Sequence, residues 1–318
     1  MKKENKIYKK SNIAALILAV TIFGTSFLHS GCANTPSQNF NDSTLDPKNT
    51  INDVVIDSPQ SIDDINPVLK ISSMYGEDFI TIDEKSLLQI IKLAMQDAEN
   101  YFVGLEAPNM TINPDGTTST NPGDFYPEWM NEYHFLARAR TESGDYSVNV
   151  LGSPVGENGY RAQGVMQLVE EWIKPTLEYY MNDIFGDNVD LSNIPLIPSK
   201  QDILTYKTSK FARDNIVQAV YNNVYLSICY DIYNAKCLNP GHTEYYSNYG
   251  GFNEDLRRIA TTALYFYERE DVISSLINGT IREYDKQGYV YKFNKHKNDI
   301  YKEYNINNSV MNSEPQKY

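Results

Sequence analysis

Apolar residues recur three and four positions apart through most of this chain, which is the spacing of one face of an α-helix. The clearest run begins after Asp83 and ends near Phe102. It contains six apolar residues at this spacing: Leu87, Leu88, Ile90, Ile91, Ala94 and Met95. We therefore predict a helix over residues 84–102.

The same periodicity predicts further helices later in the chain. They cover residues 127–142, 165–180, 210–235, 253–270 and 285–304. No alternating run of apolar and polar residues competes with them as a strand. We therefore predict that residues 84–305 form one mostly helical domain, of a size that a single hydrophobic core can stabilise.

The segments on either side of this domain are polar. Residues 32–83 are rich in Asn, Asp, Ser, Thr and Pro and have weak apolar periodicity, which is typical of a chain that buries too little apolar surface to fold. We predict a flexible tether here, although two short apolar runs, 54–56 and 68–71, could dock on the domain instead. Residues 306–318 are predicted to be a polar C-terminal tail.

The first residues have the pattern of an export signal. Lysines at the start precede an apolar run over residues 13–23, which is too short for a comfortable membrane span. Ser30-Gly31-Cys32 resembles a bacterial lipobox, although His29 stands where an aliphatic residue is usual. This pattern predicts a lipoprotein signal peptide over 1–31, acylation of Cys32, and a lipid-anchored protein on the outer face of the cytoplasmic membrane. The alternatives are an uncleaved anchor or cleavage elsewhere.

The charge balance limits the partners of the chain. It has 28 Lys and Arg against 41 Asp and Glu, and a formal net charge of −13. Nucleic acid is therefore not an expected partner, since its binding depends on a basic surface. Binding to a glycan would depend on hydrogen bonds and aromatic faces, which some of the 25 Tyr and 12 Phe could supply.

Cysteine and histidine spacing gives little sign of crosslinks or metal. Cys229 and Cys237 lie eight positions apart, which is compatible with a disulfide and equally with two buried thiols. The four histidines are scattered, and no zinc-type motif occurs. We predict no metal site and no cofactor.

Glu142 is the strongest candidate for chemistry. It ends the helix predicted over 127–142 and is followed by Ser143, a glycine-rich loop and Gly164-Val165-Met166-Gln167. Burial and the negative end of a helix both raise the pKa of a carboxyl group, as a proton donor requires. An ordinary surface glutamate is the alternative interpretation.

These residues resemble the lytic transglycosylases of the goose-type lysozyme-like superfamily, whose core reads Glu-Ser, a loop, and Gly-Leu-Met-Gln. Three later segments resemble this family in the same order: QAVYNNVYL at 218–226, ALYFYE at 263–268 and GYVYK at 288–292. Tyr267 matches the tyrosine of the family's Ala-Tyr-Asn-Ala-Gly, with Glu268 in place of the asparagine. Tyr289 matches a tyrosine that commonly reaches the catalytic glutamate.

The resemblance implies a lysozyme-like helical domain that cleaves the β-1,4 bond between N-acetylmuramic acid and N-acetylglucosamine in peptidoglycan glycan strands. Glu142 would act as acid and then as base, giving 1,6-anhydromuramyl ends. Five residues would bind or position the sugar: Ser143, Met166, Gln167, Tyr267 and Tyr289. Secretion, conjugation and cell-wall machinery are all compatible partners of a tethered enzyme of this kind.

Two other functions remain open at this point. A muramidase would hydrolyse the same bond with water and would use Asp145 or Glu268 as the second carboxylate that most glycosidases need. A glycan-binding or assembly lipoprotein would keep the fold without the chemistry, as the altered 263–268 segment would permit.

Overall fold

The structure is a computed structural model of the chain. It describes residues 59–74, 77–102, 111–112, 118–119, 125–155, 159–184, 186–238 and 254–306. The predicted signal peptide, Cys32 and most of the C-terminal tail lie outside the described residues. The predicted mostly helical class is confirmed.

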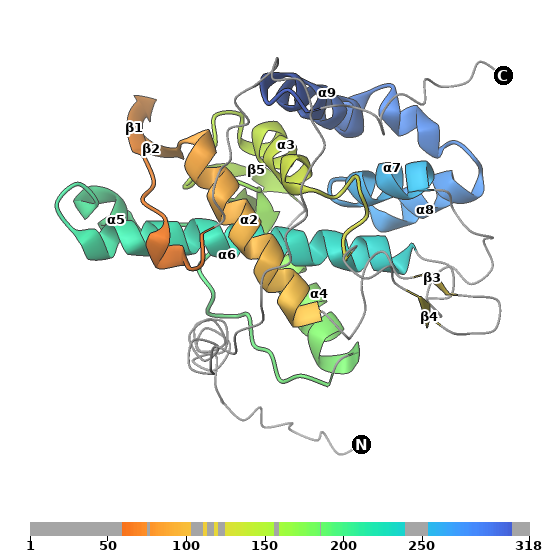
Figure 1. Ribbon diagram of the computed structural model, residues 1–318, viewed down its shortest axis with the longest axis horizontal. Coiled ribbons are helices and arrows are strands. Elements are labelled where there is room, and N and C mark those ends of the chain that lie inside the picture. The colour runs from red at the N-terminus through yellow and green to blue at the C-terminus, as the bar shows by residue number, and fades with distance from the viewer. Residues whose placement is uncertain are drawn as a thin grey trace, which may run out of the picture.

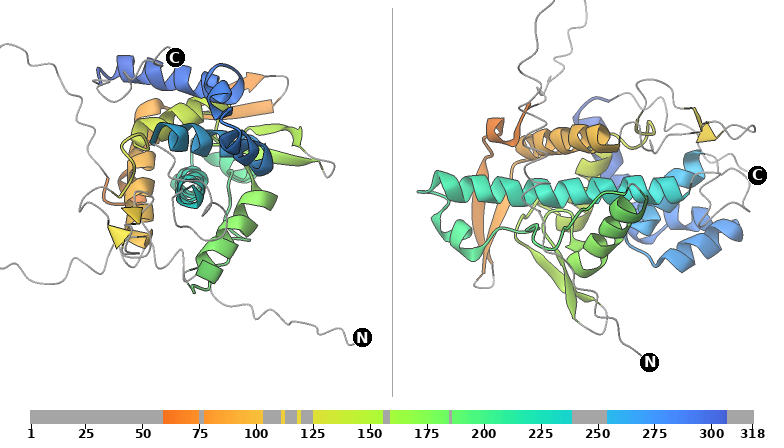
Figure 2. Two further views of the ribbon diagram at one scale, coloured as in Figure 1. Left: turned by 90° about the vertical axis from the view of Figure 1, so that its right-hand side faces the viewer. Right: turned by 90° about the horizontal axis from the view of Figure 1, so that it is seen from below.

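The long helix α6 (Lys210–Cys237) forms the centre of the domain. Its buried residues lie on all of its sides, as expected for a helix surrounded by protein. The helices that pack against it are α2 (Glu84–Phe102), α4 (Glu170–Tyr179), α5 (Lys200–Thr205) and α7 (Glu254–Leu264). Figure 1 shows α6 running across the molecule, and Figure 2 shows it end-on among its neighbours.

Helix α2 has the bounds that the apolar pattern predicts. One face is buried from Leu87 to Phe102. Its first turn is held by Asp83, whose carboxylate accepts a hydrogen bond from the backbone N–H of Ser86 at 3.0 Å, in the manner of an N-cap.

Helix α3 (Glu132–Ser143) positions the candidate acid. It begins later than predicted, because Asn131 caps it by accepting a hydrogen bond from the N–H of His134 at 3.1 Å. It ends before Gly144, which has a φ of 71°. Helix α9 (Gly288–Glu303) packs along α3. This packing brings Tyr289, near the start of α9, to the C-terminal end of α3.

A three-stranded antiparallel sheet follows α3, although no strand was predicted there. It consists of β5 (Leu151–Val155), β6 (Tyr160–Gln163) and β7 (Leu168–Val169). The helix predicted from residue 165 is wrong at its start, since α4 begins at Glu170. Gly164 and Gln167 both have positive φ, a conformation that turns the chain and cannot continue an α-helix.

The predicted tether is wrong in its last part. From residue 59 the chain forms the short 3-10 helix η2 (Ile62–Asp64) and the hairpin of β1 (Leu69–Met74) and β2 (Glu77–Ile82). Ile80 and Ile82 are buried in the core, and this burial explains why a segment of polar composition is ordered. A second, minimal hairpin joins β3 (Thr111–Ile112) to β4 (Thr118–Ser119).

The single helix predicted over 253–270 is divided in two. Helix α7 ends at Leu264 and α8 (Arg269–Ile277) starts afterwards, with a turn in which the N–H groups of Phe266 and Tyr267 both bond the carbonyl of Ala263. A 3-10 helix, η4 (Ile281–Asp285), then leads into α9. The break exposes the side chain of Phe266 and brings Tyr265 and Tyr267 next to Tyr289 of α9.

Two further findings concern the helices. Cys229 and Cys237 are buried on α6 and form no disulfide, because eight residues of helix separate them by about 12 Å, which is too far for the bond. In the part of the chain that the structure describes, no helix is long and apolar enough to span a membrane.

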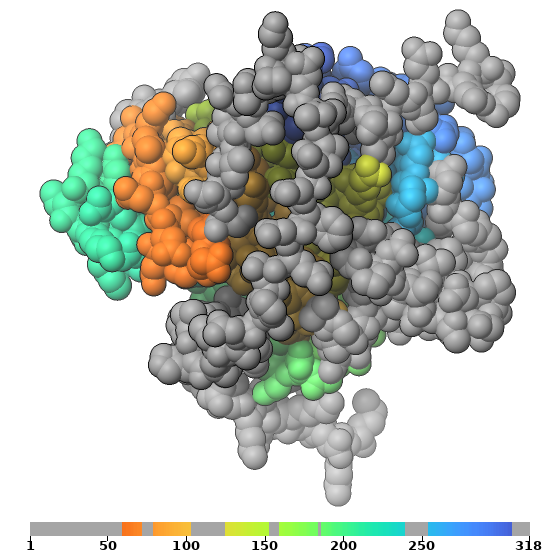
Figure 3. All heavy atoms as spheres, in the orientation of Figure 1, coloured from red at the N-terminus to blue at the C-terminus, as the bar shows by residue number. Residues whose placement is uncertain are grey.

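The surface in the orientation of Figure 1 has α5 and the β1–β2 hairpin at one edge and α7 towards the other (Figure 3).

Candidate active site

Glu142 lies in the last turn of α3 with its side chain partly buried. The Tyr289 hydroxyl donates a hydrogen bond to its Oε1. Burial raises the pKa of Glu142 from its usual value of 4.5 to about 7, against the lowering effects of the Tyr289 hydrogen bond and the charges of Arg138 and Lys292. Both protonation states of this carboxyl are therefore accessible near neutral pH.

Tyr289 is held by an aromatic cluster. It is buried, and its ring is nearly parallel to those of Phe266, with centroids 4.8 Å apart, and Tyr265, with centroids 6.4 Å apart. Phe266 is 62 % exposed, so it offers aromatic surface to solvent directly beside the tyrosine that contacts Glu142. Phe266 was not identified from the sequence, because exposure after a helix break has no local signature.

Tyr267 supports Tyr289 through the backbone. Its hydroxyl accepts a hydrogen bond from the N–H of Tyr289 at 3.0 Å, and it lines a pocket of about 220 Å³ with Glu283, Tyr284 and Gln287. Gly288 makes this contact possible, since a Cβ there would lie 2.4 Å from the Tyr267 hydroxyl. Tyr267 therefore acts on the site through the start of α9.

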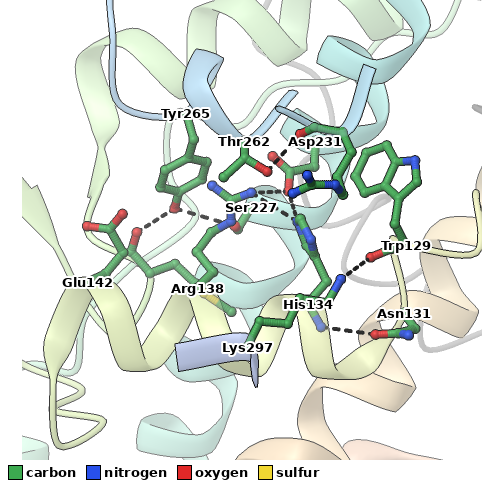
Figure 4. Close-up of polar contacts among 12 residues, drawn as sticks. Trp129, Asn131, His134, Arg138, Glu142, Ser227, Asp231, Thr262, Tyr265 and Lys297 are labelled. Atoms are coloured by element: carbon green, nitrogen blue, oxygen red, sulfur yellow. Dashed lines mark hydrogen bonds and ion pairs between the residues drawn. The ribbon is translucent and has the colours of Figure 1, made fainter. Parts of the chain in front are cut away.

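Tyr265 is the tyrosine of the 263–268 segment that lies near Glu142, although the sequence match selected Tyr267. Burial and the nearby charge of Glu142 both raise the pKa of Tyr265. Its hydroxyl donates a hydrogen bond to the carbonyl of Met166. Figure 4 shows Tyr265, Glu142 and Arg138 together.

Met166 is fully buried, and Asn223 of α6 fixes the turn around it. The N–H of Met166 donates to Asn223 Oδ1 at 2.7 Å, and Asn223 Nδ2 donates to the carbonyl of Gln163 at 2.9 Å. A Cβ on Gly164 would lie 2.7 Å from Asn223 Nδ2. The glycine of the predicted motif is thus required by this close approach, and Asn223 is a supporting residue that the sequence did not single out.

Gln167 lies in the turn before β7 and not at a helix start. Its φ is 49°, and its side-chain Nε2 donates to the carbonyls of Gly164 at 2.7 Å and Val150 at 3.3 Å. The amide therefore braces the turn against the strand before it. Its predicted contact with sugar stays a prediction.

Ser143 and Asp145 have local hydrogen-bond partners. The Ser143 hydroxyl donates to the carbonyl of Ala139 at 2.9 Å. Asp145 is exposed and accepts a hydrogen bond from Ser147 Oγ at 2.7 Å, and Glu268 is exposed at the start of α8. Among the described residues, neither Asp145 nor Glu268 shares a hydrogen bond with Glu142.

Beneath Glu142, α3 buries two nitrogen-bearing side chains against α6. His134, Arg138 and Asp231 are all completely buried, and Arg138 Nη2 lies 2.5 Å from Asp231 Oδ2. Lys297 of α9 is also completely buried and donates a hydrogen bond to the carbonyl of Trp129 at 2.7 Å (Figure 4). The apolar pattern of α3 did not predict that these groups face the core.

The described residues contain no group of three or more His, Cys, Asp and Glu side chains that could hold a metal ion. The site thus consists of one carboxyl of raised pKa, a tyrosine bonded to it and an aromatic cluster around that tyrosine. Comparisons of the chain with protein-family models, with curated proteins and with solved structures found no match.

Proposed function

We propose that this protein is a peptidoglycan lytic transglycosylase with a lysozyme-like helical domain. The observation that carries the proposal is the state of Glu142: a partly buried carboxyl of raised pKa that accepts a hydrogen bond from Tyr289. In glycoside hydrolases a second carboxylate stands about 5–9.5 Å from the acid, and the mass of the released fragments distinguishes hydrolysis from the proposed reaction.

In the proposed reaction, protonated Glu142 donates its proton to the oxygen of the glycosidic bond as the bond from that oxygen to C1 of N-acetylmuramic acid breaks. The resulting carboxylate then accepts the proton of the sugar's own C6 hydroxyl, whose oxygen bonds to C1 and closes the 1,6-anhydro ring. No water is consumed. The Tyr289 hydrogen bond favours the carboxylate form, so it supports the change of role from acid to base.

Sugar binding is proposed to rest on aromatic and hydrogen-bonding groups, because the acidic chain offers little attraction to an anionic polymer. The exposed ring of Phe266 beside Tyr289 provides an aromatic face next to the acid. Ser143, Gln167 and Tyr267 are proposed to supply hydrogen-bonding groups for the sugar.

We also propose that the signal over residues 1–31 directs export, that Cys32 carries the lipid and that the chain after it tethers the domain to the outer face of the cytoplasmic membrane. The polar composition before residue 59 supports a tether of this kind. Secretion, conjugation and wall-remodelling machinery are the partners that such a location would serve.

The proposal is tested with residues 33–318, a Glu142→Gln variant and purified peptidoglycan, and the soluble fragments are analysed by mass spectrometry. Anhydromuramyl products from the parent and none from Glu142→Gln are expected. Two matched controls are Asp145→Asn and Glu268→Gln, which should keep full activity.

Reducing ends, heavier by one water, together with loss of activity in a control variant would make the protein a muramidase. Binding to peptidoglycan without soluble products would make it a glycan-binding lipoprotein. Turnover retained by Glu142→Gln would contradict the assignment of the acid.

A further inference from the structure

A buried ion pair lies one helical turn before the proposed acid. Arg138 of α3 and Asp231 of α6 are both inaccessible to solvent, with Nη2 and Oδ2 2.5 Å apart. His134 Nε2 lies 3.0 Å from the same carboxylate oxygen and 3.1 Å from Arg138 Nη2. Figure 4 shows this cluster between α3 and α6.

The pair is connected to Glu142 through aromatic rings. The Arg138 guanidinium lies 3.7 Å from the centroid of the Tyr265 ring, a cation–π contact. Tyr265 is nearly parallel to Tyr289, and Tyr289 donates its hydroxyl to Glu142. Contacts therefore run without interruption from α6, through α3 and the turn after α7, to α9 and the acid.

The cluster is poorly explained by stability. Several of its buried polar atoms have no partner among the described residues: Arg138 Nε and Nη1, His134 Nδ1 and Asp231 Oδ1. Burying an ion pair usually costs more than its attraction returns, and an apolar replacement of similar volume is often as stable. An unusual and incompletely bonded pair next to a proposed acid favours a role in function.

The charges around Glu142 show what the pair does there. Arg138 from α3 and Lys292 from α9 lower its pKa, as does the Tyr289 hydrogen bond. Tyr265, from the turn after α7, is uncharged near neutral pH, because burial and Glu142 raise its pKa. Burial lowers the pKa of His134 well below its usual value, so this imidazole is neutral. Burial raises the pKa of Asp231 to about 6, against the lowering effect of Arg138, so at neutral pH Asp231 is the anion that balances Arg138.

We propose that Arg138 and Asp231 are positioning residues for Glu142: Asp231 neutralises the guanidinium and holds it against Tyr265, so that the acid faces a balanced pair and not a free cation. Arg138 in turn keeps Tyr265, and through it Tyr289, aligned with the carboxyl. This inference rests on the proposed role of Glu142 as the acid of the reaction.

The test uses two substitutions that remove opposite charges. Asp231→Asn leaves the guanidinium unbalanced and should lower the pKa of Glu142, by about one unit for a nearby opposite charge. Arg138→Gln removes the cation and should raise that pKa by a similar amount. A merely structural role would destabilise both variants without moving the pKa in opposite directions.

The pKa is read from the carboxyl carbon of Glu142 by NMR of the full chain labelled with ¹³C-glutamate, with Glu142→Gln to assign the signal. Circular dichroism confirms that each variant is folded. Shifts in the same direction, or no shift in folded variants, would overturn the inference. As a second readout, the basic limb of the pH–activity profile should move with the pKa.

If a single variant does not fold, the double variant Arg138→Gln/Asp231→Asn decides. It removes both buried charges, and the pKa of Glu142 should rise above that of the parent, because the guanidinium is the nearer charge. A value at or below the parent's would overturn the inference. The NMR readout does not depend on glycan cleavage. If the parent is inactive but the two variants move the pKa of Glu142 in opposite directions, the proposed function is rejected and the inference about Arg138 and Asp231 is supported. If the parent is active but the pKa of Glu142 does not move, only that inference is rejected.

Discussion

At the scale of single residues, the candidate site depends on the hydrogen bond from Tyr289 to Glu142. The donor stabilises the carboxylate, so it moderates a pKa that burial alone would raise further. The family resemblance in the sequence pointed to both residues and implied their contact. The contact itself depends on α9 returning along α3, which no local pattern of apolar and polar residues predicts.

Tyr289→Phe should therefore raise the pKa of Glu142 by about one unit, the value of a hydrogen bond to a charged group. The basic limb of the pH–activity profile, which reports loss of the proton from the acid, should move to higher pH. Tyr291→Phe is the matched control, because Tyr291 is on the same helix and 53 % exposed. An unchanged limb in Tyr289→Phe would show that the hydrogen bond does not tune the acid.

Phe266 is the second residue on which the proposal depends. Phe266→Ala should weaken binding to peptidoglycan about two- to tenfold, since an aromatic contact contributes roughly 0.5–1.5 kcal/mol. Its stability should change by less than about 0.5 kcal/mol, as for most exposed positions. Co-sedimentation with purified peptidoglycan measures the first effect and thermal unfolding the second.

The control for this variant is Phe211→Ala, because Phe211 is 74 % exposed at the start of α6. Equal binding losses in Phe266→Ala and Phe211→Ala would indicate general surface adhesion and would remove Phe266 from the site.

At the scale of elements, helices with one apolar face were predictable and helix ends near the site were not. The pattern over 84–102 matches α2 because its propensity, capping and burial agree. The predicted helix over 253–270 failed because the turn at residues 265–267 is held by tertiary contacts, including the bond from Tyr265 to Met166. The same holds for residues 164–167, where Asn223 imposes the turn.

The start of α9 gives a prediction about one such element end. Gly288 has a φ of 73°, and a Cβ there would meet the Tyr267 hydroxyl. Gly288→Ala should destabilise the protein by more than the roughly 1–2 kcal/mol cost of a left-handed conformation, and it should reduce activity by displacing Tyr289. Chemical denaturation and the cleavage assay measure the two effects.

Gly279→Ala isolates the cost of conformation in that experiment. Its φ is 71°, yet no atom lies within 4 Å of the added Cβ. Gly279→Ala should lower the free energy of unfolding only by the cost of the left-handed conformation, and it should keep full activity. Equal effects of the two substitutions would mean that the contact with Tyr267 is unimportant.

At the scale of the whole molecule, two buried ionisable groups should give the stability a minimum near neutral pH. Glu142 has a pKa of about 7 in the folded protein against 4.5 ordinarily, so the folded state binds more protons and stability falls from pH 4.5 to 7. Burial lowers the pKa of Lys297 to about 7 from 10.5, so there the unfolded state binds more protons and stability rises from pH 7 to 10.5.

Urea unfolding across this range checks both contributions. The stability of Glu142→Gln relative to the parent should rise between pH 4.5 and 7, because the variant lacks the carboxyl group whose contribution to the parent's stability falls over this range. Lys297→Met should lose stability relative to the parent between pH 7 and 10.5. A pH-independent difference for either variant would show that its group has an ordinary pKa in the folded protein.

The sequence by itself determined the mostly helical class, the position of α2 and α6, and the candidacy of Glu142 and Tyr289, because these depend on periodicity and on local motifs. Tertiary structure alone decided that residues 59–74 and 77–83 are ordered, that Tyr265 and Phe266 join the site and that Arg138 pairs with Asp231. Each of these depends on contacts between elements distant in the chain, whose free energy overrides local propensity and has no signature in any single segment.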